Sequence, residues 1–228
     1  MSVTATVAKK IDAVLFDLDG VIIDSNKAII SAWLTTAEEY GYSFTQAEVD
    51  RYIIGASHLF TLDNLFPDRS DSEKKVIHSK VDQREEEAIY RTIDGVEKFI
   101  YRLRNFDVKV GLVTSSWPEK IKNVMEQHNL NFDCIVCRND VQRGKPDPQP
   151  YQLAMEKLAI APENCLVFED SDNGIYSAVA AGANCIAVKN DHFSHIPYIE
   201  DFNQLCIDDS EFSYQLANAN KGIAIRPL

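Results

Sequence analysis

The chain has 228 residues, of which 45% are hydrophobic and 25% are charged, a composition typical of a globular protein with its own core. The formal net charge of −12 argues against nucleic acid and anionic membrane surfaces as partners, because both are negatively charged. No segment approaches the roughly 18 apolar residues that cross a membrane, and the first ten residues lack the apolar region of a secretory signal. We therefore expect a cytoplasmic protein, whose oligomeric state the sequence does not indicate.

Short apolar runs predict buried strands of a parallel sheet. Continuous runs of this length are typical of strands that helices cover on both faces. Cys134 and Cys137 have the CxxC spacing but lie within the apolar stretch 132–137 around one of these runs, so we interpret them as core thiols rather than as redox or zinc ligands. The runs are residues 13–16, 108–113, 134–136, 166–168 and 186–188.

Helical patterns separate most of these runs, and each begins with a residue that can cap a helix. The alternation of strand and helix predicts an α/β fold with a doubly wound, Rossmann-like parallel sheet. We interpret the aromatic and acidic run at residues 199–212 as an exposed surface segment. The expected caps are Asp94 with Glu97 as a capping box, Ser116, Asp147 before Pro148, and Ser171 or Asp172.

Residues 25–92 interrupt the alternation, since they contain amphipathic helical patterns and no convincing strand. The first pattern ends at Gly41, and the last spans about residues 72–90. We expect a helical cap domain at residues 25–92, inserted into an α/β core formed by residues 1–24 and 93–228. The insertion leaves the sheet at the carboxyl end of its first strand, where ligands bind in open α/β sheets, and can therefore act as a lid.

Acidic, hydroxyl and lysine side chains follow the predicted strands. Because the carboxyl ends of parallel strands meet at one edge of a sheet, these side chains should converge there. Together they form the set of groups that handling a phosphoryl group with a divalent metal requires. They are Asp17 and Asp19 after the first strand, Thr114, Ser115 and Ser116 after the second, Lys145 in the loop after the third, and Glu169 and Asp170 at the end of the fourth.

Each of these side chains suits one step of phosphoryl transfer. Asp17 can attack phosphorus and form an aspartyl phosphate, and Asp19 can serve as general acid and base. Thr114 and Lys145 would bind the phosphoryl oxygens, and Ser115 is a further candidate for this role. Mg²⁺ would offset the negative charge, held by oxygen ligands from Asp17, Glu169 and Asp170.

Four motifs in family order resemble the haloacid dehalogenase superfamily of phosphotransferases over about residues 12–188. The resemblance implies a nucleophile at Asp17, an acid–base residue at Asp19, and phosphate ligands at Thr114 and Lys145. It also implies metal ligands at Asp17, Glu169 and Asp170, with the backbone carbonyl of Asp19 as another. Glu169 could instead orient the site without touching the metal. The motifs are DLDGVIID at 17–24, VTSS at 113–116, GKPDP at 144–148 and FEDSDNG at 168–174.

The form of the last motif and the helical insertion are similar to the branch that holds β-phosphoglucomutase and small sugar-phosphate or phosphoglycolate phosphatases. In the mutases an arginine usually follows the Gly-x-Ser turn of the cap, whereas here His58 follows Gly55 and Ser57. Histidine is a weaker, pH-dependent phosphate ligand, although His58 remains a candidate substrate contact. We expect a Mg²⁺-dependent phosphomonoester hydrolase acting on a small sugar or polyol phosphate. The alternatives are a phosphosugar mutase and a non-catalytic regulator that binds a phosphorylated metabolite.

Overall fold

The central element of the molecule is a parallel sheet with the strand order β5-β4-β1-β6-β7-β8. The computed structural model describes residues 11–53, 58–207 and 214–216. All five predicted strands are present, and the predicted doubly wound α/β fold is confirmed. Tyr198–Ile199 adds a sixth strand, β8, that the sequence pattern did not predict. The other strands are β1 (Ala13–Phe16), β4 (Lys109–Val113), β5 (Cys134–Val136), β6 (Cys165–Glu169) and β7 (Asn184–Val188).

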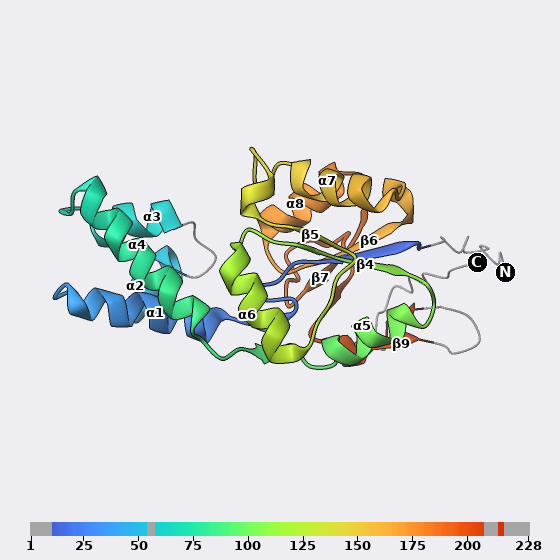
Figure 1. Ribbon diagram of the computed structural model, residues 1–228, viewed down its shortest axis with the longest axis horizontal. Coiled ribbons are helices and arrows are strands. Elements are labelled where there is room, and N and C mark those ends of the chain that lie inside the picture. The colour runs from blue at the N-terminus through green and yellow to red at the C-terminus, as the bar shows by residue number, and fades with distance from the viewer. Residues whose placement is uncertain (1–10, 54–57, 208–213, 217–228) are drawn as a thin grey trace.

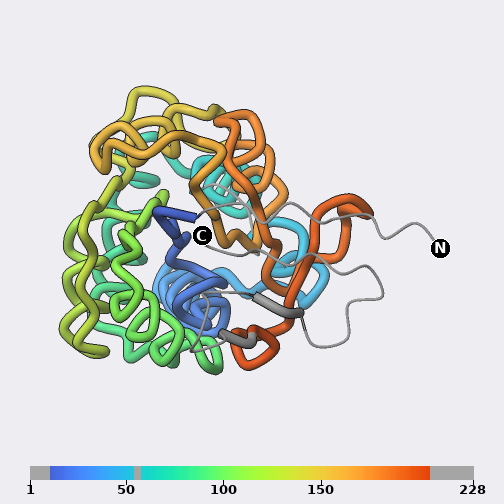
Figure 2. Tube along the Cα trace, turned by 90° about the vertical axis from the view of Figure 1, so that its right-hand side faces the viewer, coloured from blue at the N-terminus to red at the C-terminus, as the bar shows by residue number. Residues whose placement is uncertain are grey.

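Helices cover both faces of this sheet, α5 and α6 on one side and α7 and α8 on the other (Figure 1). Side chains of β1 alternate between the two apolar cores, because successive residues of a strand point to opposite faces. Val14 and Phe16 join the core under α5 and α6, and Leu15 joins the core under α7 and α8. Figure 2, turned by 90°, shows blue β1 between these two layers. The helices are α5 (Val96–Arg104), α6 (Pro118–His128), α7 (Gln149–Leu158) and α8 (Asp172–Ala180).

The described residues of 26–86 form four helices, which stand apart from the sheet and enclose a separate apolar cluster around Trp33 and Phe66 (Figure 1). Contrary to the expectation of no strand within residues 25–92, β3 (Arg91–Thr92) pairs with β2 (Ile23–Asp24) in antiparallel fashion at the base of this segment. The predicted domain boundaries at residues 25 and 92 stay a prediction. The helices are α1 (Asn26–Glu39), α2 (Gln46–Tyr52), α3 (His58–Leu65) and α4 (Asp71–Glu86).

The predicted helix caps were partly wrong. Ser171 caps α8 by accepting a hydrogen bond from the Gly174 amide at 3.1 Å, as predicted. Gly95 at φ +84° stands at the N-cap of α5, so the capping box of Asp94 does not form. Ser116 does not cap α6, which begins after Trp117. In each wrong case a tertiary contact or a backbone geometry that only glycine adopts readily overrode the local pattern.

The chain after β7 returns to the core, which corrects the expectation of an exposed segment from residue 199. Phe202 is 2% exposed, and its ring lies 5.0 Å from that of Phe168 and 6.0 Å from that of Phe16, between ring centres. Beyond Phe202, β9 (Leu205–Ile207) and β10 (Tyr214–Leu216) form a two-stranded antiparallel sheet. In the part of the chain that the structure describes, no helix has the length and apolar character needed to cross a membrane.

The aromatic cluster predicts the effect of a substitution at Phe202. Phe202→Ala should lower the free energy of unfolding by about 3–5 kcal/mol, because it removes a buried ring and leaves a cavity. Urea denaturation followed by circular dichroism measures the change. Tyr198→Ala, in the same segment but 48% exposed, is the control and should change stability by less than about 0.5 kcal/mol. Equal effects of the two variants would contradict the packing described here.

Candidate active site

Asp17 directly follows β1, and its position is fixed by the centre of the sheet. β1 pairs in parallel with β4 on one side and β6 on the other, so the three strands end at one edge. The Asp17 amide continues this pairing by donating to the Phe168 carbonyl at 3.0 Å. The residue is only 7% exposed, so its carboxyl group is largely shielded from water.

Lys145 supplies the positive charge of the site. Its Nζ donates to Asp17 Oδ1 at 2.7 Å and to the Val113 carbonyl at 3.0 Å, and it forms an ion pair with Glu169. Burial by itself would lower the pKa of Lys145, but the carboxylates of Asp17 and Glu169 outweigh burial and raise it. The lysine therefore remains charged between two acids that belong to neighbouring strands.

Glu169, the last residue of β6, is completely buried and is held by several donors. It accepts hydrogen bonds from Tyr151 at 2.6 Å and from Ser171 at 3.2 Å, besides its contact with Lys145. A Cβ atom at Gly174 would lie 2.0 Å from this carboxyl group, so only glycine permits α8 to approach so closely. The amino-acid pattern does not reveal this role of Tyr151, because the partner of its hydroxyl group comes from a distant strand.

Three carboxyl groups converge beside Lys145. One oxygen atom from each of Asp17, Glu169 and Asp170 lies within 4.8 Å of the others, which makes this group a candidate metal site. Burial raises the pKa of Asp17 to about 7, and burial together with repulsion by Asp17 raises that of Asp170 to about 8. Gly20 permits the close approach, since a Cβ there would lie 2.0 Å from Asp170 Oδ2. A set of oxygen donors with excess negative charge fits a hard cation such as Mg²⁺.

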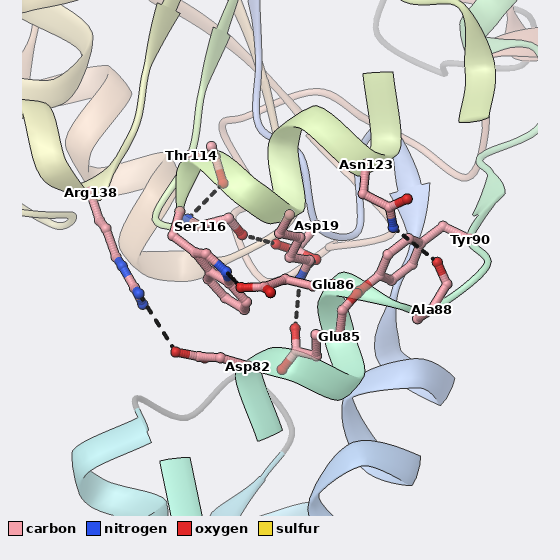
Figure 3. Close-up of polar contacts among 12 residues, drawn as sticks. Asp19, Asp82, Glu85, Glu86, Ala88, Tyr90, Thr114, Ser116, Asn123 and Arg138 are labelled. Carbon is pink, nitrogen blue, oxygen red and sulfur yellow. Dashed lines mark hydrogen bonds and ion pairs between the residues drawn. The ribbon is translucent and has the colours of Figure 1, made fainter. Parts of the chain in front are cut away.

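Asp19 does not belong to this group of three carboxyl groups, and its side chain contacts α6. Its Oδ2 accepts a hydrogen bond from Ser116 at 2.7 Å, and its Oδ1 pairs with Lys120 at 2.8 Å (Figure 3). Burial opposes ionisation, yet Lys120 and the hydroxyl groups of Ser116 and Ser25 lower the pKa of Asp19. The sequence analysis did not identify Lys120, because a single lysine in a helix does not indicate which acids it will contact. A metal contact by the backbone carbonyl of Asp19 stays a prediction.

The predicted phosphate ligands differ in exposure. Thr114 is 5% exposed at the end of β4, directly after the carbonyl group that Lys145 contacts, and its Oγ1 accepts a hydrogen bond from the Ser116 amide. Ser115 is exposed next to it. Lys145 is in contact with Asp17 and Glu169, as described above. The phosphate-binding roles of these residues stay predictions.

His58 is the first residue of α3, and the turn that precedes it lies outside the described residues. Its ring stacks on that of His78 with centres 4.1 Å apart. Burial and the nearby charge of Arg138 lower the pKa of His58, which favours the neutral ring. A neutral histidine binds phosphate more weakly than a cation. Its role as a substrate contact stays a prediction.

Comparison with known proteins identifies the family of this chain. Residues 14–188 match a family model described as haloacid dehalogenase-like hydrolase, and this stretch contains all the carboxylates discussed above. The chain belongs to this family. The four motifs that predicted it are thus part of one matched domain, and the predicted resemblance is confirmed.

Members of the family with similar sequences are named phosphatases. The chain is 31% identical over 178 residues to the phosphorylated carbohydrates phosphatase of Thermotoga maritima, covering 75% of this chain and 82% of the relative. It is 32% identical over 189 residues to the pyrophosphatase PpaX of Bacillus mycoides, with coverages of 78% and 84%. The predicted class of enzyme, a phosphatase of this family, is confirmed.

The fold also agrees with a solved structure. β-Phosphoglucomutase from Clostridium difficile has a TM-score of 0.73 to this chain at 24% identity, covering 86% of this chain and 93% of the mutase chain. At this level of identity the similarity concerns the fold alone. It confirms the Rossmann-like core with a helical cap.

The raised pKa values predict a pH-dependent response to metal. The pKa of an aspartate carboxyl group is ordinarily 3.8, but in the fold it is about 7 for Asp17 and about 8 for Asp170, so the metal-free folded state binds more protons than the unfolded chain between these values. Stability that is present below pH 4 should therefore fall as the pH rises toward 8. Because a cation binds the ionised carboxylates, excess Mg²⁺ should raise the melting temperature at pH 8 by about 2–4 °C or more, and hardly at pH 5.

Thermal denaturation with chelator or with MgCl₂ at the two pH values measures this response. Asp170→Asn should reduce both the decline with pH and the effect of Mg²⁺. Asp50→Asn, an exposed acid in α2, is the control and should behave as the unaltered protein does. An equal effect of Mg²⁺ at both pH values, or in Asp170→Asn, would contradict the assignment of a metal to this group.

Proposed function

We propose that the protein is a Mg²⁺-dependent phosphomonoesterase that transfers the phosphoryl group of a small sugar or polyol phosphate to Asp17 and then to water. The observation that carries this proposal is the contact of Lys145 with both Asp17 and Glu169, beside Asp170. One buried cation and three carboxyl groups provide a nucleophile and a binding place for an anion together with a divalent metal. Phosphatases of this family generally use Mg²⁺, which supports the choice of metal.

In the first step a carboxylate oxygen of Asp17 attacks phosphorus, and the bond from phosphorus to the leaving oxygen breaks. Lys145 fixes the Asp17 carboxylate through Oδ1 and supplies a positive charge beside the attacking group. Asp19 gives its proton to the leaving oxygen, which departs as an alcohol. Mg²⁺, held by Asp17 and Asp170 with Glu169 in reach, would offset the negative charge that gathers on the phosphoryl oxygens.

In the second step water attacks the aspartyl phosphate, and the bond between Asp17 and phosphorus breaks. Asp19 accepts a proton from this water, and the same proton serves the leaving group of the next substrate. Ser116 and Lys120 hold Asp19 in the carboxylate form that accepts a proton. The cycle returns Asp17 to its starting state and releases inorganic phosphate, so atoms and charges balance.

The substrate class rests on relatives and on the cap. The phosphorylated carbohydrates phosphatase of Thermotoga maritima supports a sugar or polyol phosphate as substrate. A mutase that moves phosphate within a sugar remains the alternative, but it requires a cap cation where this chain has His58. The non-catalytic regulator is not retained, because the family relationship supports an enzyme. We propose the cytoplasm as its compartment, supported by free thiols at Cys134, Cys137, Cys165 and Cys185.

Loss of the nucleophile provides the first test. Asp17→Asn should lower Mg²⁺-dependent release of phosphate from a generic aryl phosphate by at least about 10³-fold, because no aspartyl phosphate forms. A colorimetric assay of released phosphate, run over a few dozen metabolites with Mg²⁺ or chelator, measures activity and names the substrate. Activity of Asp17→Asn near that of the unaltered protein would refute the mechanism. Turnover of a sugar phosphate only in the presence of its bisphosphate would favour the mutase.

The cap residue His58 provides the second test. His58→Ala should change the ranking of metabolites in the screen, while hydrolysis of the aryl phosphate stays within about 3-fold, because His58 is expected to contact the substrate and not the reacting atoms. The ratio of kcat/KM values across substrates is the measured quantity. Lys75→Ala, in the neighbouring helix α4 and exposed, is the control. Abolished activity on every substrate would show that His58 belongs to the catalytic machinery instead.

A further inference from the structure

Lys120 connects the acid–base residue of the core to the helical segment above it. The residue lies in α6, is 1% exposed, and pairs with Asp19 Oδ1 and with Glu85 Oε2, each at 2.8 Å. Asp19 belongs to the loop after β1, whereas Glu85 belongs to the last turn of α4 (Figure 3). One buried ammonium group thus joins two parts of the chain that are 66 positions apart in sequence, from residue 19 to residue 85.

The surroundings hold this lysine in one place. The rings of Trp117 and Tyr90 each lie with their centres 5.5 Å from Nζ, and Glu85 is 6% exposed. Lysine is rarely buried so deeply unless it is paired, because a charge without water needs opposite charges nearby. Both acids raise the pKa of Lys120 against the effect of burial, so it remains a cation. Lys120 forms two ion pairs in the described part of the chain, one with Asp19 and one with Glu85. Removing Glu85 would therefore leave only the pair with Asp19.

Asp19 is held at both oxygen atoms. Ser116 donates to Oδ2 and Lys120 pairs with Oδ1, so the plane of the carboxyl group is fixed from two sides. A carboxyl group that transfers a proton must point at the reacting oxygen, and a single remaining contact would let it rotate. The nucleophile has a separate support, since Lys145 and not Lys120 contacts Asp17. Lys120 thus contacts Asp19, whereas the lysine that contacts Asp17 is Lys145.

The same end of α4 contacts the core at two further points. Trp117 donates through Nε1 to Glu86 at 2.5 Å, and Arg138 pairs with Asp82 at 3.7 Å (Figure 3). These contacts also join α4 to the core, but the pairs formed by Glu86 and Asp82 do not include Asp19. Among these three acids of α4, Glu85 is the one that shares a lysine with Asp19. Its neighbour Glu86 contacts Trp117 instead, so a variant of Glu86 is a matched control for a variant of Glu85.

We propose that Lys120 is a positioning residue of the phosphatase reaction, and that Glu85 sets the position of Lys120, so that the seating of α4 on the core aligns Asp19 for proton transfer. This inference rests on the proposed acid–base function of Asp19. It assigns to the helical segment a role in the chemical step in addition to covering the site. When α4 leaves the core, Lys120 loses one of its two anchoring acids and Asp19 loses its alignment.

The test compares two substrates that differ in their need for a proton. An alkyl phosphate releases a strongly basic oxygen that requires protonation, whereas p-nitrophenyl phosphate releases a weakly basic one. The value of kcat/KM reports on steps up to transfer of the phosphoryl group to Asp17. Lys120→Met should lower kcat/KM for the alkyl phosphate by about 10–100-fold and for the aryl phosphate several-fold less. Lys120→Arg, which keeps the cation, should recover part of the loss.

Glu85 and Glu86 provide the matched pair. Glu85→Gln should lower the ratio of alkyl to aryl kcat/KM, as Lys120→Met does. In the double variant, the fold-decrease of this ratio should be smaller than the product of the two single fold-decreases. Glu86→Gln removes an acid from the same turn and should leave the ratio unchanged. Equal losses on both substrates in Lys120→Met, or a change of ratio in Glu86→Gln as large as in Glu85→Gln, would overturn the inference.

Asp19→Asn separates this inference from the function on which it rests. If Asp19→Asn leaves the substrate ratio unchanged, the acid–base role of Asp19 is wrong and the proposed mechanism fails. If Asp19→Asn lowers the ratio and the Lys120 and Glu85 variants do not, only the inference fails. Urea denaturation checks that each variant folds, and Glu85→Gln with Lys120→Arg carries the test if Lys120→Met does not fold.

Discussion

The site depends on one buried lysine that lies between acids from two neighbouring strands. Lys145 contacts Asp17 after β1 and Glu169 at the end of β6, and all three are nearly inaccessible to water. Buried charges cost free energy unless they are paired, so this contact constrains the loop that carries Lys145 to the sheet edge. The remaining carboxyl group, Asp170, leaves the cluster with excess negative charge. This excess is what makes the cluster suited to a divalent cation.

Two glycines let the backbone pack closely against the carboxyl groups of the site. Gly20 and Gly174 lie against the carboxyl groups of Asp170 and Glu169, where any side chain would overlap them. The two glycines come from separate motifs, one after β1 and one in the first turn of α8, and they close the site from two directions. Close approach of the main chain thus replaces solvent around the acids, which is also why burial raises the pKa values of Asp17 and Asp170.

A second lysine extends the site toward the helical segment. Lys145 contacts Asp17, the proposed nucleophile, whereas Lys120 contacts Asp19 and Glu85 in α4. The two acids of the first motif are therefore oriented by different cations from different elements. In the proposed mechanism, this separation lets the position of the helical segment affect Asp19 without disturbing Asp17.

The pattern of residues by itself determined the five central strands, the helical insertion and the acids after β1 and β6, because parallel strands give continuous apolar runs and their ends carry the polar groups. Which side chains contact one another was decided by the tertiary structure alone. Ser116 was expected to cap a helix but binds Asp19, Phe202 was expected at the surface but fills the core, and the contacts of Lys120 left no trace in sequence. Local periodicity records which face of an element is buried, whereas the identity of a partner across dozens of residues depends on how the layers pack.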